Sequence, residues 1–98
     1  MRDAAACLER GELWLVDVRE PDEWRDGRAP SAELVPLADL AERLPEIAAA
    51  DRRVAFICHS GVRSAYACLA AEPFGIRAVN VQGGMVAWHA AALPMISG

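Results

Sequence analysis

Residues 56–65 have the sequence FICHSGVRSA, which is the most informative stretch of the chain. An apolar strand ends at Cys58, a short loop containing Gly61 follows, and a helix then begins. The N–H groups of such a loop and of the first helical turn lack intrahelical partners, and together with the helix dipole they favour an anion. A cysteine at this point is expected to favour the thiolate, its nucleophilic form. Arg63 adds a fixed positive charge at the far end of the loop.

Apolar runs on either side of this stretch predict the sheet. Residues 54–57 show no polar alternation, which is typical of a strand that is buried on both faces of a parallel sheet. Residues 13–18 are apolar except for Asp17, residues 78–81 form a further strand, and residues 34–35 can form a short one. The strands alternate with helices, so we expect an α/β fold with an open, mostly parallel sheet of four to five strands flanked by helices.

Helix signals fill the intervals between the strands. Proline and acidic residues suit a helix start at residue 21, and Pro45 is expected to end a helix before a second short turn. The predicted helices cover residues 3–9, 21–26, 39–44 and 64–72 and a last segment after the glycine pair at 83–84. The predicted inner faces are Ala65, Cys68 and Leu69 in the fourth helix and Met85, Trp88 and Ala92 in the last. In such sheets ligands bind beyond the carboxyl ends of the strands, where Asp17 and Cys58 lie.

Composition excludes several classes of function. The chain has 98 residues, which suits one domain spanning residues 1–98, and its net charge of −4 with scattered basic residues argues against a general nucleic-acid binder. Lysine is absent, which excludes lysine-based Schiff-base chemistry and a phosphate-binding loop of the GxxxxGK[ST] type.

The cysteines and the apolar runs indicate the compartment. Cys7, Cys58 and Cys68 are odd in number and no two have CxxC spacing, so neither a disulfide framework nor a cysteine-built zinc site is expected. The acidic side chains of residues 20–26 suit a solvated helix face and not a metal site. We expect no cofactor either. No apolar run approaches the roughly 20 residues that span a bilayer, and no signal pattern opens the chain. A soluble protein of a reducing cytoplasm is predicted, without membrane contact.

Four stretches, in this order, resemble the rhodanese-like sulfurtransferases. They are DVREPDEW at 17–24, GRAPSA at 27–32, CHSGVR at 58–63 and GGMVAW at 83–88. The resemblance covers nearly the whole chain and implies the rhodanese-like fold. Two departures stand out: Arg28 and Ala29 replace the usual His-Ile pair, and the short strand that the family usually has before its first helix is not evident. The second departure suggests a trimmed chain or a sheet that is one strand short at an edge.

The resemblance implies a mechanism. Cys58 would attack the outer sulfur of a small anionic donor such as thiosulfate, become a persulfide and release sulfite, and a thiol or cyanide would then take the sulfur. A protein thiol can serve as the acceptor. The substrate-binding positions implied are the remaining loop residues, namely His59, Ser60, Gly61, Val62, Arg63 and Ser64.

Other functions stay open at this point. The phosphatase and arsenate-reductase relatives of the family have a loop one residue longer than the four residues between Cys58 and Arg63, and a shorter loop suits a single sulfur atom better than a tetrahedral oxyanion. Ile57 also stands where protein tyrosine phosphatases place a histidine. A non-catalytic docking module and a dedicated persulfide carrier remain alternatives, because a fold does not fix a function.

The charged residues near the site are expected to be mainly structural. Asp17 ends a buried strand and must therefore be paired. Arg19 is expected to form an ion pair with Glu23 or Glu20. Arg63 either contacts the donor anion or braces the loop against a carboxylate such as Asp17, because its fork of donors suits both roles.

The polar loop residues have less specific signals. His59 is expected to point outward as a solvated histidine, with proton transfer to the acceptor as the alternative. Ser60 and Ser64 can donate to the sulfur or cap the helix, and capping is expected for at least one of them. Cys68 is expected to pack in the core, and Cys7 is assigned no role.

Overall fold

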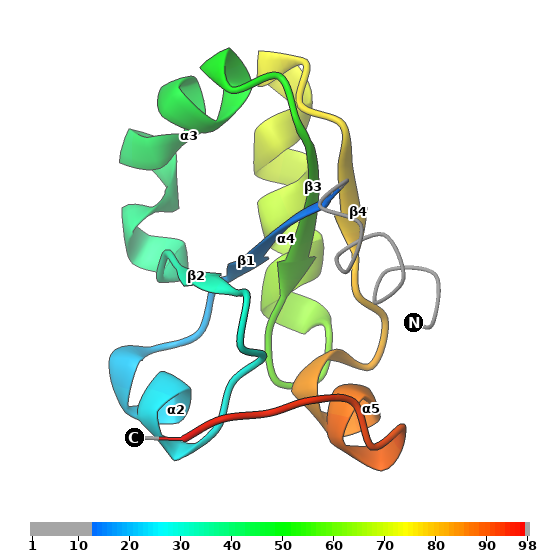
Figure 1. Ribbon diagram of the computed structural model, residues 1–98. Helices are drawn as coiled ribbons and strands as arrows, with labels where there is room; N and C mark the ends of the chain where they lie inside the picture. The colour runs from blue at the N-terminus through cyan, green and yellow to red at the C-terminus, as the bar shows by residue number, and fades with distance from the viewer. Residues whose placement is uncertain (1–12, 98) are drawn as a thin grey trace.

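The computed structural model describes residues 13–97, and Figure 1 shows its strands and helices. The helix predicted over residues 3–9 and Cys7 lie outside the described residues. Four strands form one sheet in the order β2-β1-β3-β4, and every neighbouring pair is parallel. The strands are β1 (Leu13–Asp17), β2 (Glu33–Leu34), β3 (Arg53–Ile57) and β4 (Ala78–Asn80). The prediction of an open parallel sheet with helices between its strands is confirmed.

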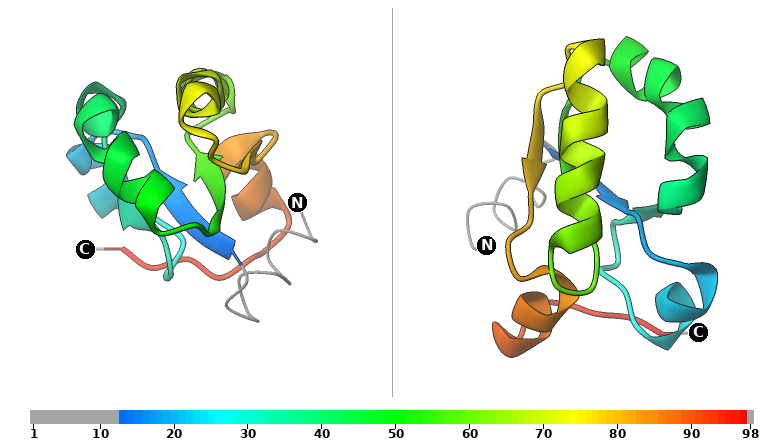
Figure 2. Two further views of the ribbon diagram at one scale, coloured as in Figure 1. Left: turned by 90° about the horizontal axis from the view of Figure 1, so that it is seen from above. Right: turned by 180° about the vertical axis from the view of Figure 1, so that it is seen from behind.

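The helices cover both faces of the sheet. They are α2 (Pro21–Asp26), α3 (Leu40–Ala49), α4 (Val62–Ala71) and α5 (Gly84–Ala90), with 3-10 turns at η1 (Leu37–Asp39) and η2 (Glu72–Phe74). Figure 2 shows α3 and α4 on the same side of the sheet, whereas α5 belongs to the other side. In Figure 1, α2 and α5 both lie near the end of the sheet at which β3 stops.

Strand β3 is buried on both faces, as its sequence predicted. Val54 and Phe56 pack into a cluster with residues of α3 and α4, and Ala55 and Ile57 pack into a second cluster with Met85 of α5. Burial of the apolar side chains on both faces supplies the main driving force for this arrangement. Because β3 is the centre of both clusters, the residue that follows it is held in a fixed place.

Two helices differ from their predictions. Helix α3 continues through Pro45, where an end was expected. The proline removes one backbone donor, but Leu40, Leu44 and Ile47 are all buried on one face and hold the helix together across it. Helix α5 ends at Ala90, so Ala92 is exposed and lies outside the helix, whereas Met85 and Trp88 are buried as expected.

The inner face of α4 was also predicted wrongly. The helix begins at Val62, earlier than expected, and buries Ser64, Ala67 and Ala71. Leu69 is 62% exposed, and Cys68 is only partly buried at the edge of a cluster. The prediction followed the larger apolar side chains, but close packing of α4 on the sheet is achieved by small ones. None of the described helices is both long and apolar enough to cross a membrane.

Candidate active site

Cys58 lies directly beyond the end of β3 and is only 1% exposed. Its Sγ accepts backbone N–H groups from Gly61, at an N···S distance of 3.1 Å, and from Ser64, at 3.5 Å. The Ser64 hydroxyl lies 3.4 Å from the same sulfur. The loop therefore surrounds the sulfur with donors.

These contacts decide the protonation of the thiol. Burial by itself would raise the pKa of Cys58, but the hydrogen bonds that the sulfur makes with Ser64 and with the backbone N–H groups of Gly61 and Ser60 outweigh it and lower that pKa below its ordinary value. Cys68 lacks such donors, and burial raises its pKa. Of the two described cysteines, only Cys58 is prepared to act as a thiolate.

Helix α5 fixes the outer side of the loop. The N–H groups of Met85 and Val86 donate to the carbonyl oxygens of Cys58 and His59, at 2.8 and 3.1 Å. Gly84 has a φ of +54° and allows this approach, because a Cβ at this position would overlap both carbonyl groups. Since these carbonyls point at α5, the N–H groups of the loop are left to face the sulfur.

A buried ion pair lies beside the loop. Asp17 is the last residue of β1, opposite Ile57 of β3 in the sheet, and it is fully buried. Both of its carboxylate oxygens accept hydrogen bonds from the Arg19 side chain, at 2.8 to 3.0 Å. Arg19 also donates to the Gly27 carbonyl, at 2.7 Å. Asp17 is thus paired, as predicted, but the expected pairing of Arg19 with Glu23 or Glu20 is wrong, because Asp17 already occupies the guanidinium.

Arg63 pairs with a carboxylate of another helix. Its two terminal nitrogens donate to the two oxygens of Glu23 in α2, at 2.7 and 2.9 Å. Arg63 therefore braces the loop against a carboxylate, but that carboxylate is Glu23 and not Asp17 as expected. The hydrogen bonds from Arg63 lower the pKa of Glu23 to about 2, so the acidic face of α2 is not merely solvated. In return, the carboxylate raises the pKa of Arg63.

Neither predicted serine caps α4. The N-cap is Gly61, whose φ of +107° favours glycine, and no side chain caps the helix. Ser64 is instead fully buried, with its hydroxyl between Cys58 and Asn80, and Ser60 is exposed. The capping prediction failed because a left-handed glycine opens this helix.

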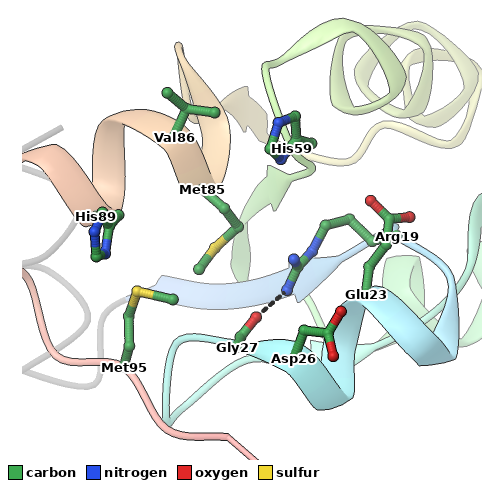
Figure 3. A pocket seen from close by; sticks show the side chains of 9 residues that line it. All are labelled: Arg19, Glu23, Asp26, Gly27, His59, Met85, Val86, His89 and Met95. Atoms are coloured by element: carbon green, nitrogen blue, oxygen red, sulfur yellow. Dashed lines mark hydrogen bonds between the residues drawn. The ribbon is translucent and has the colours of Figure 1, made fainter.

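A cleft of about 590 Å³ opens beside the loop. Figure 3 shows it between α2 and α5, with His59 at its upper edge and Met85, His89 and Met95 along it. His59 is exposed, as predicted. Among residues 13–97 there is no group of histidine, cysteine and acidic side chains that could hold a metal ion.

Asn80 is a site residue that the sequence analysis missed. It ends β4, and its side chain contacts both Gly61 and Ser64. The rule that singled out Asp17 and Cys58, position at the carboxyl end of a parallel strand, applies equally to Asn80.

Comparison with known proteins finds similarity to rhodanese-like domains and sulfurtransferases. The family model for the rhodanese-like domain matches residues 1–91. The putative sulfurtransferase YtwF of Bacillus subtilis is 40% identical over 83 residues, covering 85% of this chain and 80% of that protein. The thiosulfate sulfurtransferase GlpE of Vibrio cholerae is 31% identical over 93 residues, covering 94% and 87%. The crystal structure of a rhodanese-related protein from Thermoplasma volcanium matches with a TM-score of 0.86 at 30% identity, covering 97% of this chain and 95% of that one.

Proposed function

This chain belongs to the rhodanese-like domain family, and we propose that it acts as a sulfurtransferase that carries sulfur on Cys58. One observation carries the proposal: a buried cysteine sulfur, next to a helix N-terminus, accepts two backbone N–H groups and lies beside a hydroxyl. This arrangement supports a thiolate, and a thiolate is the nucleophile that sulfur transfer needs. The names of the relatives YtwF and GlpE support the same class of reaction.

In the proposed reaction, the Cys58 thiolate attacks the outer sulfur of the donor. With thiosulfate, a new S–S bond forms to Cys58, the S–S bond of the donor breaks, and sulfite leaves with the bonding electron pair. An acceptor thiolate then attacks the outer sulfur of the persulfide and regenerates the Cys58 thiolate. The N–H groups of Gly61 and Ser64 hold negative charge on the sulfur at the start and end of this cycle.

The name of GlpE supports thiosulfate as the small anionic donor. The acceptor is proposed to be a thiol, on a small molecule or on a protein, that enters through the cleft beside His59. A cytoplasmic setting fits this chemistry, because a reducing compartment keeps both thiols free.

The direct test of the reaction measures sulfur transfer from thiosulfate to cyanide. We expect Cys58→Ser to abolish the transfer and Cys68→Ser, the matched control on α4, to leave it largely intact. Activity that persists in Cys58→Ser would reject the proposal. Hydrolysis of an aryl phosphate without sulfur transfer would favour a phosphatase instead.

A further inference from the structure

Asn80 contacts the Cys58 loop at two points. Its Nδ2 donates to the carbonyl oxygen of Gly61 at 3.1 Å, and its Oδ1 accepts the hydroxyl of Ser64. A carbonyl oxygen can only accept, so the bond to Gly61 fixes which end of the amide faces which partner. The amide oxygen therefore faces Ser64, and the hydroxyl must be the donor between them.

The Ser64 hydroxyl has one hydrogen to donate, and two possible acceptors lie next to it, Cys58 Sγ and Asn80 Oδ1. While Ser64 donates to Asn80, it presents a lone pair to Cys58 Sγ, 3.4 Å away, so a neutral thiol donates to the hydroxyl. A thiolate would instead be stabilised if the hydroxyl turned its hydrogen toward the sulfur. That rotation breaks the bond to Asn80 and leaves two acceptor oxygens facing each other, which is costly because Ser64 is fully buried and Asn80 is half-buried.

We propose that Asn80 is a positioning residue that withholds the Ser64 hydrogen from Cys58 and leaves the sulfur anion to the backbone N–H groups of the loop. This inference rests on the proposed function, because it assigns how the sulfur-carrying thiolate is tuned. A thiolate with fewer donors is more basic, and intrinsic nucleophilicity rises with basicity. In the persulfide, the inner sulfur bears little charge, so the hydrogen stays with Asn80.

Ionisable groups from every neighbouring element surround the loop. They are Arg63 of α4, Glu23 and Asp26 of α2, His89 of α5, His59 of the loop, and the Asp17–Arg19 pair at the end of β1. The Asn80 side chain makes its hydrogen bonds with Ser64 and Gly61 and not with these ionisable groups. The neutral variants Asn80→Ala and Ser64→Ala keep all of these charges and add none, so a comparison between them isolates the hydroxyl.

A double-mutant cycle on the whole chain tests the proposal. The pKa of Cys58 is measured from the rate of its alkylation against pH, located by mass spectrometry, in the presence and absence of the Ser64 hydroxyl. Asn80→Ala is made in the native chain and in Ser64→Ala, and the change in the Cys58 pKa is compared between the two. We expect the change in the native chain to be more negative by about half a pKa unit or more. Half a unit corresponds to about a threefold change in the ratio of thiolate to thiol. The cycle cancels the loss of the bond to Gly61, which occurs in both backgrounds. Gln82→Ala removes an exposed amide just beyond β4 and should leave the pKa unchanged.

A second variant covers a failure of Asn80→Ala to fold. Asn80→Asp has nearly the same size, and it loses the bond to the Gly61 carbonyl in both backgrounds. Its carboxylate accepts the hydroxyl more strongly, so it should raise the Cys58 pKa more with Ser64 present than in the Ser64→Ala background. The proposal would be overturned if a variant at Asn80 changed the Cys58 pKa equally with and without the Ser64 hydroxyl. It would also be overturned if Asn80→Ala raised the Cys58 pKa more in the native chain than in Ser64→Ala. Alkylation does not require sulfur transfer, so this result is independent of whether the proposed function holds.

Discussion

At the scale of single residues, Cys58 combines burial with hydrogen bonding. Its side chain is almost fully enclosed, which alone would favour the neutral thiol. The donors that surround the sulfur reverse this preference, because a charged acceptor gains more from hydrogen bonds than a neutral one. The reactivity of the residue therefore depends on the loop conformation.

The pH dependence of alkylation tests this balance. The pKa of Cys58 is lowered, so its thiolate persists below the pH at which a free thiol is protonated. We expect the rate of alkylation of Cys58 by iodoacetamide to inflect at a lower pH than that of a free thiol, because the loop stabilises the thiolate. Alkylation of Cys68, followed in the same digest, should inflect higher. An inflection for Cys58 near about 8.5 would show that the loop does not activate it.

The sequence could predict where Cys58 lies, but not which partners the side chains around it would have. Cys58 is recognised from a local pattern, a strand followed by a glycine loop and a helix. Arg63 and its actual partner Glu23 are 40 residues apart, and Ser64 and Asn80 are 16 apart. Such pairs depend on how α2 and β4 pack against the loop, and no local signal distinguishes Glu23 from the other acids of its helix.

At the scale of elements, the pair between Arg63 and Glu23 joins α4 to α2. Both side chains are about one-third exposed, so the pair should contribute only about 0.2–1 kcal/mol to stability. We expect Arg63→Ala to lower Tm modestly and leave KM for thiosulfate little changed. Arg63→Lys should not restore Tm, because lysine keeps the charge but loses the planar fork. A normal Tm with KM raised more than roughly tenfold, about 1.4 kcal/mol, would instead assign Arg63 to the donor.

The same pair predicts a specific acid sensitivity. The pKa of Glu23 falls from 4.5 to about 2 on pairing, so the folded state favours the carboxylate. Its stabilising contribution is complete above pH 4.5 and is lost as the pH falls toward 2. Thermal unfolding against pH should therefore show a smaller acid loss of Tm in Glu23→Gln than in the native chain. Asp22→Asn, an exposed acid of the same helix, is the control, and an equal effect of both variants would contradict the role of the pair.

Helix α5 depends on one glycine for its contact with the loop. Gly84 and Gly75 both have positive φ, but a Cβ at Gly84 would lie 2.6 Å from the carbonyl oxygen of His59, whereas a Cβ at Gly75 would meet nothing within 4 Å. Gly75→Ala should cost about 1–2 kcal/mol, the penalty of the left-handed conformation. Gly84→Ala should cost more than about 3 kcal/mol, because backbone must also move. Denaturant unfolding measures both, and similar costs would show that the close approach is unimportant.

At the scale of the whole molecule, the alternation of apolar strands and helices was enough to predict a parallel α/β sheet. The predictions that were wrong concern the extent of α3 and the buried face of α4, both of which depend on packing. Pro45 lies inside α3 because three buried side chains outweigh one lost hydrogen bond, and α4 turns its small residues inward because the sheet is close. Neither effect is visible in the local sequence, since each depends on what another element presents.

The topology explains why the site lies where it does. Strands β1, β3 and β4 are parallel neighbours, so their carboxyl ends bring Asp17, Cys58 and Asn80 to one edge of the sheet. The buried clusters on both faces fix β3, and α5 and the Asp17–Arg19 pair hold the loop beyond it. We therefore expect sulfur to be carried at this edge of the sheet, on Cys58.

The intact mass of the protein after incubation with thiosulfate shows whether Cys58 carries sulfur. We expect the chain to gain the mass of one sulfur atom and to lose it again when cyanide is added. The gain should persist in Cys68→Ser and disappear in Cys58→Ser. No gain in mass, or a gain that Cys58→Ser retains, would contradict the account.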